Sequence, residues 1–255
     1  MKISFYIVFL IVSLQLKNAS APEYRNLWVV WNIGQGQWVT HIQPDTCRHY
    51  DMGGEFGSFK SIRKNLLSHC GNKDNRIHLS HWDYDHFMNI PAAAKALPRL
   101  CWEHSPEFGF MKKSAQEVLS LNIPACKGQS HGQRQSQSVW VPIGPRTTNE
   151  ASQIFFTGQI LITGDSPVQQ EKIWAFEIEN LRRTKVLILG HHGSRTSTGE
   201  ILLQNLPDLK FAIASARFQK YRHPHPETLS RLAKYNIPVL KTEDWGNIWF
   251  TSETE

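Results

Sequence analysis

The stretch LSHWDYDHFMN, residues 79–89, decides how the rest of the chain is interpreted. It places two histidines and two aspartates, His81, Asp83, Asp85 and His86, within six residues, directly after a short apolar run. Imidazole and carboxylate groups are ligands for divalent metal ions, so their density here predicts a metal site. The alternative is a solvated acidic turn, in which Asp85 stabilises the N-terminus of a following helix. The other polar segments distinguish these two interpretations.

Similar polar clusters follow three further apolar runs. QILITG leads to Asp165, KVLILG leads to His191 and His192, and FAIASA is followed by YRHPHPE, which contains His223 and His225. Loops that leave neighbouring strand ends converge in sheet proteins, so these separate segments can meet in one cleft. A two-metal hydrolytic centre needs several imidazoles and carboxylates, one of which bridges the ions. Asp165, isolated after a glycine, is the predicted bridge.

The apolar pattern predicts a mixed sheet system with helices outside it. Strands are predicted at residues 27–33, 38–42, 77–80, 154–156, 159–163, 186–190, 211–214, 238–241 and 247–250. Helices are predicted at residues 59–68, 112–119, 166–181, 198–205 and 226–235. Thr157 and Gly158 between two strands predict a hairpin turn, and the polar stretch 127–138 predicts a loop.

Six short motifs occur in the order that is typical of one family. They are GQG at 34–36, DMGG at 51–54, SHWDYDH at 80–86, TGD at 163–165, HHGS at 191–194 and HP at 223–224. Each is weak alone, but the ordered set resembles the metallo-beta-lactamase superfamily, and within it the C-terminal domain of the ComEC/Rec2 competence proteins, over roughly residues 27–250. The resemblance implies an α/β fold, the four-layer αββα metallo-beta-lactamase sandwich, with metals at one edge.

The resemblance also implies a dinuclear metal site. Its first metal would be bound by His81, Asp83 and bridging Asp165, and its second by Asp85, His86, Asp165 and one of His191 and His192. Asp83 stands where many relatives carry histidine, which shifts the preference of the first site from zinc toward manganese or magnesium. We therefore expect two divalent ions, zinc or manganese, with magnesium as a third candidate. The superfamily's middle histidine motif has no clear counterpart, which predicts a weak first site, and NEAS at 149–152 occupies the place of the branch's Asn-rich motif.

Two residues are predicted to take part in catalysis. Asp85 can orient a nucleophilic water, and His223 can contact a phosphate or protonate a leaving group. The alternative for His223 and His225 is a turn made by Pro224 and Pro226, which caps the following helix and leaves both histidines solvated. DMGG at 51–54 is expected to shape a turn beneath the site.

The function that follows is an exported metal-dependent hydrolase, a phosphodiesterase or nuclease acting on DNA or RNA. The resemblance carries this expectation, because the competence domain is implicated in degrading DNA. Hydrolysis of a phosphocholine ester, a carboxylic ester or a lactam is an alternative, since one fold supports many reactions. A non-catalytic binding module is another, because Asn32, Gln37, Met88 and Asn89 depart from the family pattern. The formal net charge of +6 agrees with an anionic partner but carries little weight.

The N-terminus predicts a signal peptide over residues 1–21, followed by a single domain over residues 22–255. An apolar run of residues 3–16 is short for a membrane span, and small residues follow it. Pro22 disfavours cleavage directly after Ala21, so cleavage nearby or retention as an N-terminal anchor stay open. A secreted or periplasmic location is expected, with no other membrane domain. Cys47, Cys70, Cys101 and Cys126 allow three full disulfide pairings or four buried thiols, and pairing Cys47 with Cys70 and Cys101 with Cys126 would bridge two local segments.

Overall fold

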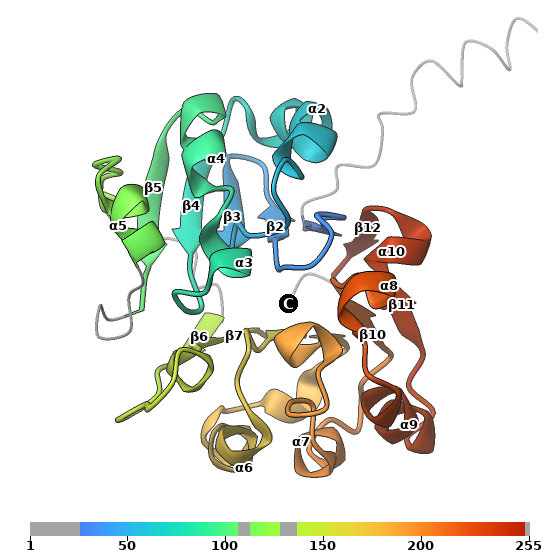
Figure 1. Cartoon of the computed structure of the whole chain (residues 1–255). Helices are drawn as coiled ribbons and strands as arrows, with labels where there is room; N and C mark the ends of the chain where they lie inside the picture. The colour runs from blue at the N-terminus through green and yellow to red at the C-terminus, as the bar shows by residue number, and fades with distance from the viewer. Residues whose placement is uncertain (1–25, 107–112, 128–136, 253–255) are drawn as a thin grey trace, which may run out of the picture.

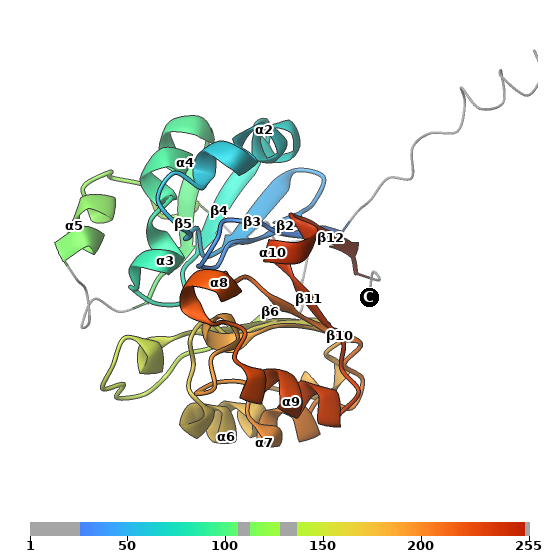
Figure 2. The ribbon, with the colours of Figure 1, turned by 45° about the vertical axis from the view of Figure 1, so that its right-hand side comes forward.

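The computed structural model describes residues 26–106, 113–127 and 137–252, so the predicted signal peptide lies outside the described residues. Two six-stranded sheets pack face to face, and helices cover both outer faces (Figures 1 and 2). This is the predicted four-layer αββα sandwich, and the fold class is confirmed. No helix within the described ranges combines the length and the apolar composition needed to cross a bilayer.

The first sheet has the strand order β12-β1-β2-β3-β4-β5, and its last three strands are parallel. Its strands are β1 (Leu27–Val30), β2 (Val39–Ile42), β3 (Thr46–Tyr50), β4 (Asp74–His78), β5 (Leu100–His104) and β12 (Ile248–Thr251). The second sheet has the order β11-β10-β9-β8-β7-β6, with β8 to β11 parallel. Its strands are β6 (Gln137–Trp140), β7 (Ile154–Thr157), β8 (Ile160–Ile162), β9 (Val186–Ile188), β10 (Phe211–Ala214) and β11 (Val239–Lys241).

Three apolar layers hold the sandwich together, because alternate residues of each strand face opposite sides. Trp28 and Val30 pack with Phe155, Ile162 and Ile213 between the sheets. Helices α2 (Phe59–Cys70), α4 (Ile90–Ala96) and α5 (Lys113–Leu119) bury the outer face of the first sheet. Helices α6 (Val168–Glu177), α7 (Glu200–Gln204) and α9 (Pro226–Lys234) bury that of the second. The short helices α3 (Tyr84–Phe87), α8 (Phe218–Tyr221) and α10 (Thr242–Trp245) lie in connections.

The predicted elements are present, and seven further strands and α-helices were missed. Each of the nine predicted strands and five predicted helices has a counterpart in the structure, and the hairpin between β7 and β8 is confirmed. Strands β3, β5 and β6 and helices α3, α4, α8 and α10 were not predicted. The prediction of a loop through residue 138 is wrong at its end, because Gln137 and Ser138 pair with β7, and residues 128–136 lie outside the described residues.

The four cysteines form two disulfides. Cys47 on β3 is joined to Cys70 at the end of α2, and Cys101 on β5 is joined to Cys126. The sequence had left the pairing open, and the structure selects the two local bridges. Both attach an outer segment to the first sheet.

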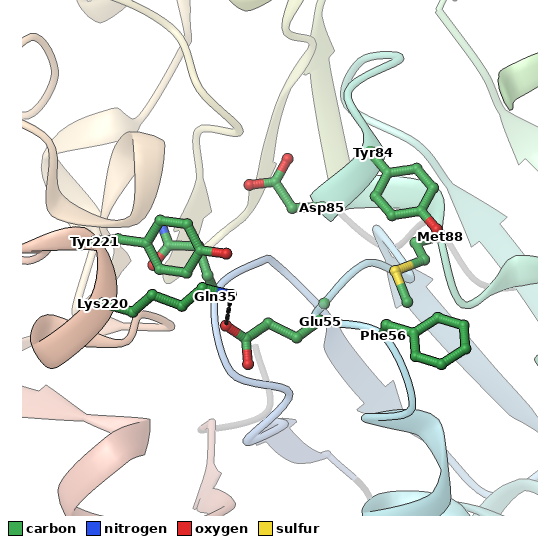
Figure 3. Close-up of a pocket in the computed structure, with 9 residues that line it drawn as sticks. Gln35, Glu55, Phe56, Tyr84, Asp85, Met88, Lys220 and Tyr221 are labelled. Carbon is green, nitrogen blue, oxygen red and sulfur yellow. Dashed lines mark hydrogen bonds and ion pairs between the residues drawn. The ribbon is translucent and has the colours of Figure 1, made fainter. Parts of the chain in front are cut away.

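The topology brings the predicted site residues to one rim of the sandwich. Parallel strands β3 and β4 lead into residues 51–54 and 79–86, and parallel strands β8, β9 and β10 lead into the loops after residues 162, 188 and 214. A pocket of about 290 Å³ opens at this rim beside Asp85 (Figure 3). A pocket of about 360 Å³ lies at the other end of these strands, where Lys185 and Lys210 precede β9 and β10, away from the predicted ligands.

Candidate metal centre

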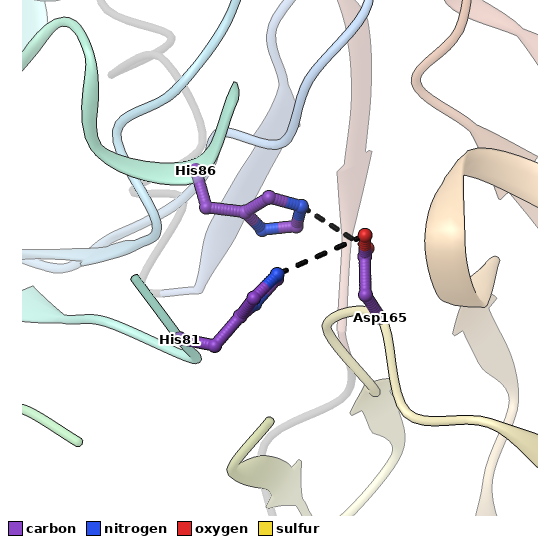
Figure 4. Close-up of side chains that lie close together, drawn as sticks. All are labelled: His81, His86 and Asp165. Carbon is purple, nitrogen blue, oxygen red and sulfur yellow. Dashed lines mark ion pairs between the residues drawn. The ribbon is translucent and has the colours of Figure 1, made fainter. Parts of the chain in front are cut away.

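Asp165, in the loop after β8, lies at the centre of the predicted site. Its Oδ1 lies 3.0 Å from Nε2 of His86 and 3.9 Å from Nε2 of His192. Its Oδ2 lies 3.8 Å from Nε2 of His81 and 3.6 Å from Nε2 of His191. Figure 4 shows His81 and His86 pointing at this carboxylate. The two oxygens of one buried carboxylate thus face different histidine pairs, which is the arrangement a bridging ligand requires.

We name the two halves of the centre after the oxygen that each faces. The Oδ1 side consists of His86, His192 and Asp85, whose Oδ2 lies 3.1 Å from Nε2 of His192. The Oδ2 side consists of His81, His191 and Asp83, whose Oδ2 lies 3.5 Å from Nε2 of His81. All seven predicted ligand residues therefore come together, and that they bind metal stays a prediction.

Two overlapping groups have donor atoms close enough to hold an ion. Donor atoms of Asp85, His86 and His192 all lie within 4.8 Å of one another, and so do those of His81, His86 and Asp165. His86 belongs to both groups, which the sequence did not predict. Asp83 contacts His81 and His191 contacts Asp165, but neither residue belongs to the second group, because their donor atoms do not all lie within 4.8 Å of its donor atoms.

Unpartnered buried atoms test whether these residues suit a metal ion. Nε2 of His81, Nε2 of His86 and Oδ1 of Asp165 are buried without a hydrogen bond of normal geometry. A buried polar atom without a partner is costly, so a native structure compensates for it with a water or an ion. These three atoms all belong to the group formed by His81, His86 and Asp165. A divalent cation fits this mixed nitrogen and oxygen donor set.

Asp51 fixes the orientation of His86. Its Oδ2 accepts a hydrogen bond from Nδ1 of His86 at 2.7 Å, and also from the Gln37 amide at 2.7 Å and the Ser80 hydroxyl at 2.8 Å. Its Oδ1 accepts from the backbone N–H of Ser80 at 2.7 Å. A proton held on Nδ1 leaves the Nε2 lone pair for a metal, as carboxylate partners of metal-bound histidines do. DMGG therefore lies beneath the site, as predicted, and its aspartate positions a ligand.

The glycines of two motifs allow this close packing. A Cβ on Gly53 would lie 1.6 Å from the carbonyl oxygen of Asp85, and one on Gly36 would lie 2.5 Å from the same atom. That carbonyl accepts hydrogen bonds from the backbone N–H groups of Gln37 and Gly54, each at 3.0 Å. The GQG and DMGG motifs therefore pack directly against the backbone that carries Asp85 and His86. Only glycine leaves room for that backbone at these positions.

The Oδ2 side is supported by weaker contacts. The Thr148 hydroxyl donates to Oδ2 of Asp83 at 2.9 Å, and the Asn149 amide lies 3.4 Å from Nδ1 of His191. His191 is 30% exposed, whereas Asp51 is fully buried. Asn149, in the segment that was matched to the branch's Asn-rich motif, thus lies beside the site and contacts the predicted ligand His191.

The buried histidines of the Oδ1 side and Asp165 shift one another's pKa values. Burial by itself lowers the pKa of His86, but the Asp165 and Asp51 carboxylates outweigh burial and raise this pKa well above its ordinary value. Burial by itself raises the pKa of Asp165, but His86 and His192 hold it well below its ordinary value. A metal ion at His86 would therefore compete with a proton, and its binding would release that proton.

His223 and His225 were given one alternative interpretation from the sequence, but the structure places them in different surroundings. His225 accepts at Nδ1 from the backbone N–H of Glu227 and caps α9, so the turn interpretation holds for this residue. The ring of His223 lies 5.8 Å from that of His191, at the rim of the centre. Burial, together with His192 and His191, lowers the pKa of His223 to about 4. His223 is therefore neutral at physiological pH.

Gln35 determines which nitrogen of His223 carries the proton. The Gln35 carbonyl accepts from the backbone N–H of Arg217 at 3.2 Å, which turns its amide nitrogen toward Nδ1 of His223, also at 3.2 Å. An amide nitrogen only donates, so Nδ1 accepts and Nε2 holds the proton. His223 can then donate a hydrogen bond but cannot act as an imidazolium acid at neutral pH.

Solved structures establish the class of fold. The chain superposes with a TM-score of 0.52 on the metallo-beta-lactamase fold protein YhfI from Bacillus subtilis, with 12% identity over 89% of this chain and 100% of that one. A diphosphatase of the PhnP family gives a TM-score of 0.53, with 12% identity over 89% of this chain and 98% of that one. The protein therefore has the metallo-beta-lactamase fold, although no protein-family model matches its sequence.

Sequence relatives define the family more closely. Recombination protein 2 of Haemophilus influenzae is 38% identical over 259 aligned residues, covering 97% of this chain and 31% of the relative. ComE operon protein 3 of Bacillus subtilis is 33% identical over 110 residues, covering 42% and 14%, and competence protein ComA of Neisseria gonorrhoeae is 23% identical over 252 residues, covering 91% and 33%. The chain is a homologue of these ComEC/Rec2 competence proteins, and it spans at most about a third of their length.

Several residues of the site escaped prediction. Thr148 belongs to no motif, and NEAS, which contains Asn149, was not expected to contact a ligand, although Thr148 contacts Asp83 and Asn149 contacts His191. Gln37 had been noted as a departure from the family pattern, and the structure shows that it donates to Asp51. The signal that could have revealed Asp51 was its DMGG motif, because a buried carboxylate between a strand and two glycines needs several donors.

Proposed function

We propose that the protein is an exported metal-dependent phosphodiesterase that cleaves DNA or RNA at the rim centred on Asp165. The observation that carries this proposal is the division of ligands between the two Asp165 oxygens. A divalent ion on each side of one carboxylate is the arrangement that two-metal hydrolases use. The relatives support nucleic acid as the substrate, since their names assign them to competence and recombination.

Export is supported by two independent features. Residues 3–16 form an apolar run near the N-terminus, and the two disulfides suit an oxidising compartment. The proposed location is secreted or periplasmic, with residues 1–21 as the signal peptide and residues 22–255 as one domain.

Each residue at the rim has a defined task in this proposal. His86, His192 and Asp85 would hold one divalent ion, His81, His191 and Asp83 the other, and Asp165 would contact both. Bound ions would supply Lewis-acid stabilisation of the phosphoryl oxygens and lower the pKa of a nucleophilic water. The partly exposed Asp85 carboxylate would orient that water by accepting a hydrogen bond. Neutral His223 would donate its Nε2 proton in a hydrogen bond to a phosphate oxygen.

The test is a substrate panel under three metals. Purified protein would be incubated with manganese, magnesium or zinc and offered single-stranded DNA, duplex DNA, RNA, bis-p-nitrophenyl phosphate or a chromogenic lactam. Asp85→Ala is the inactive variant, and Asp208→Ala, which removes an exposed carboxylate, is the matched control. We expect metal-dependent cleavage of nucleic acid that Asp85→Ala loses and Asp208→Ala keeps. Cleavage that survives Asp85→Ala would contradict the mechanism, and turnover of the lactam alone would contradict the substrate.

A further inference from the structure

The pocket beside Asp85 is the feature that the proposed reaction leaves unused. Figure 3 shows Tyr84, Met88 and Phe56 along one side of it and Lys220 and Tyr221 along the other, with Asp85 between them at the edge. Its volume is about 290 Å³. Since Asp85 belongs to the Oδ1 side of the metal centre, a ligand in this pocket would lie next to the group undergoing hydrolysis.

Exposed aromatic rings distinguish this pocket from the rest of the described surface. Phe56 is 93% exposed, Tyr84 49% and Tyr221 41%, and all three line the pocket. Single exposed aromatic side chains are ordinary, but three around one concave site indicate a ligand with a flat apolar face. The largest buried side chains, in contrast, are the tryptophans Trp28, Trp31, Trp38, Trp82 and Trp174, so tryptophan provides the core and not this surface.

Charges of both signs accompany the rings. Lys220 is the cation among the lining residues, and Glu55 and Asp85 are the carboxylates. Glu55 forms ion pairs with Lys220 at 3.5 Å and with Arg217, which lies outside the lining, at 2.8 Å. About half of each cationic side chain is exposed, and the ammonium of Lys220 also lies 4.8 Å from the ring centroid of Tyr221. A ligand with a flat ring and a nearby anionic group matches this combination, since bases stack on aromatic rings while cations contact the backbone phosphates.

We propose that this pocket binds an unpaired nucleobase of the nucleotide next to the cleaved phosphodiester, which makes single-stranded nucleic acid the favoured substrate. The inference rests on the proposed nuclease function and specifies its substrate. A base can lie against Phe56 or Tyr221 only after it leaves its neighbours in the stack. A duplex must first unpair and unstack that base, whereas a single strand offers it directly.

The test measures base-dependent binding separately from cleavage. Fluorescence anisotropy would compare a labelled oligothymidylate with an abasic oligonucleotide of the same length, which carries the same phosphates. Calcium would replace the activating metal. We expect the protein to bind oligothymidylate about tenfold to a hundredfold more tightly than the abasic strand, the range for one stacked base. Phe56→Ala and Tyr221→Ala would each lower this ratio at least severalfold.

Phe176→Ala is the matched control, because Phe176 is 70% exposed on α6, on the other outer face of the molecule. It should leave the ratio unchanged. Equal affinity for the two oligonucleotides, or a ratio that Phe56→Ala does not alter, overturns the inference. Cleavage of duplex as fast as of single strand also overturns it and leaves the nuclease proposal standing. Base-dependent binding without cleavage under any metal supports the pocket and overturns the nuclease function instead.

Discussion

The two sides of Asp165 differ in how their histidines are supported. On the Oδ1 side, His86 is anchored by Asp51, a fully buried carboxylate that also accepts three hydrogen bonds from Gln37 and Ser80. On the Oδ2 side, His191 is partly exposed and contacts Asn149 at 3.4 Å, and Asp83 depends on the hydroxyl of Thr148. His81 on the Oδ2 side is fully buried and lies with Nδ1 3.0 Å from the Ser80 hydroxyl, so the contrast concerns His191 and Asp83. These two residues are held by neutral groups of a connecting segment, whereas a buried carboxylate orients His86.

This difference indicates an order of metal affinity. A charged, buried hydrogen-bond partner orients a ligand more strongly than a neutral one near solvent. We therefore expect the ion on the Oδ1 side to bind more tightly. The superfamily's middle histidine motif has no clear counterpart in the sequence, which is also expected to weaken the Oδ2 side, so both effects act in the same direction.

Removing the shared carboxylate should abolish the difference altogether. Asp165→Asn leaves neither side with its bridging oxygen pair, so we expect loss of both ions and a fall in kcat of at least about a thousandfold. Elemental analysis after gel filtration would give the metal content, and Asp208→Asn would serve as the surface control. A variant that keeps one ion at full occupancy would show that Asp165 does not bridge.

Substitutions of the residues that hold the ligands on each side should lower the two metal affinities by different amounts. Asp51→Asn places an amide NH₂ against donors on Ser80, Gln37 or His86, so we expect the affinity of the tighter ion to fall about 10- to 100-fold and the Tm to drop. Thr148→Val on the other side should weaken the second ion by less than about tenfold, because it removes one hydrogen bond from a neutral donor. Competition titrations with a chelating dye would measure both. Equal losses in the two variants would contradict the proposed order of affinity.

Exchanging a ligand type should change the metal preference of the Oδ2 side alone. Asp83→His adds an imidazole where the chain has an oxygen donor, so the affinity of that side for zinc relative to manganese should rise by about tenfold. Zinc and manganese titrations of the variant and the natural chain would show it. A shift of both ions together would mean that the two sides are not independent.

The smallest effect on metal affinity is expected from a residue that supports the loop shared by both sides. Glu171 is buried and accepts from the backbone N–H groups of Thr198 and Gly199, which end the loop that carries His191 and His192. Burial raises the pKa of Glu171 to about 7, against an ordinary value of 4.5, although these two hydrogen bonds lower it. The folded state thus binds the proton more tightly, and its contribution to stability is lost as the pH rises from about 4.5 to about 7.

Glu171→Gln should remove this part of the pH dependence, which amounts to about 2–3 kcal/mol in the free energy of unfolding. His41, His49 and His78 act in the opposite direction, because burial lowers their pKa values to about 3, 4 and 4 and stability is lost as the pH falls below about 6.5. The natural protein and Glu171→Gln share these three histidines, so the difference between their pH profiles of the free energy of unfolding reports on Glu171. Urea unfolding at pH 5 and pH 7.5 would measure it, and parallel pH profiles would refute the assignment. Metal affinity should change by less than about threefold on both sides.

The missed elements show where sequence patterns lose information. β3, TCRHY, alternates buried and partly buried residues, but its buried positions include His49, which satisfies its ring nitrogens with Thr40 and Asn75. A buried polar residue of this kind interrupts the apolar pattern from which a strand is predicted. Its burial is possible because its hydrogen-bond partners come from other segments. α4, IPAAAKA, has only seven residues, too few to show helical periodicity.

From the sequence alone we could infer nine of the twelve described strands, the αββα fold through its motif order, and the residue types that gather at the rim. These depend on local patterns, since a strand end followed by histidine or aspartate is visible in a few consecutive residues. Only the tertiary structure decided that one oxygen of Asp165 faces His86 and His192 and the other His81 and His191. It also selected the disulfide pairs and brought Phe56, Tyr84 and Tyr221 around one pocket. Such relations depend on side-chain direction across packed sheets, and no spacing along the chain encodes that.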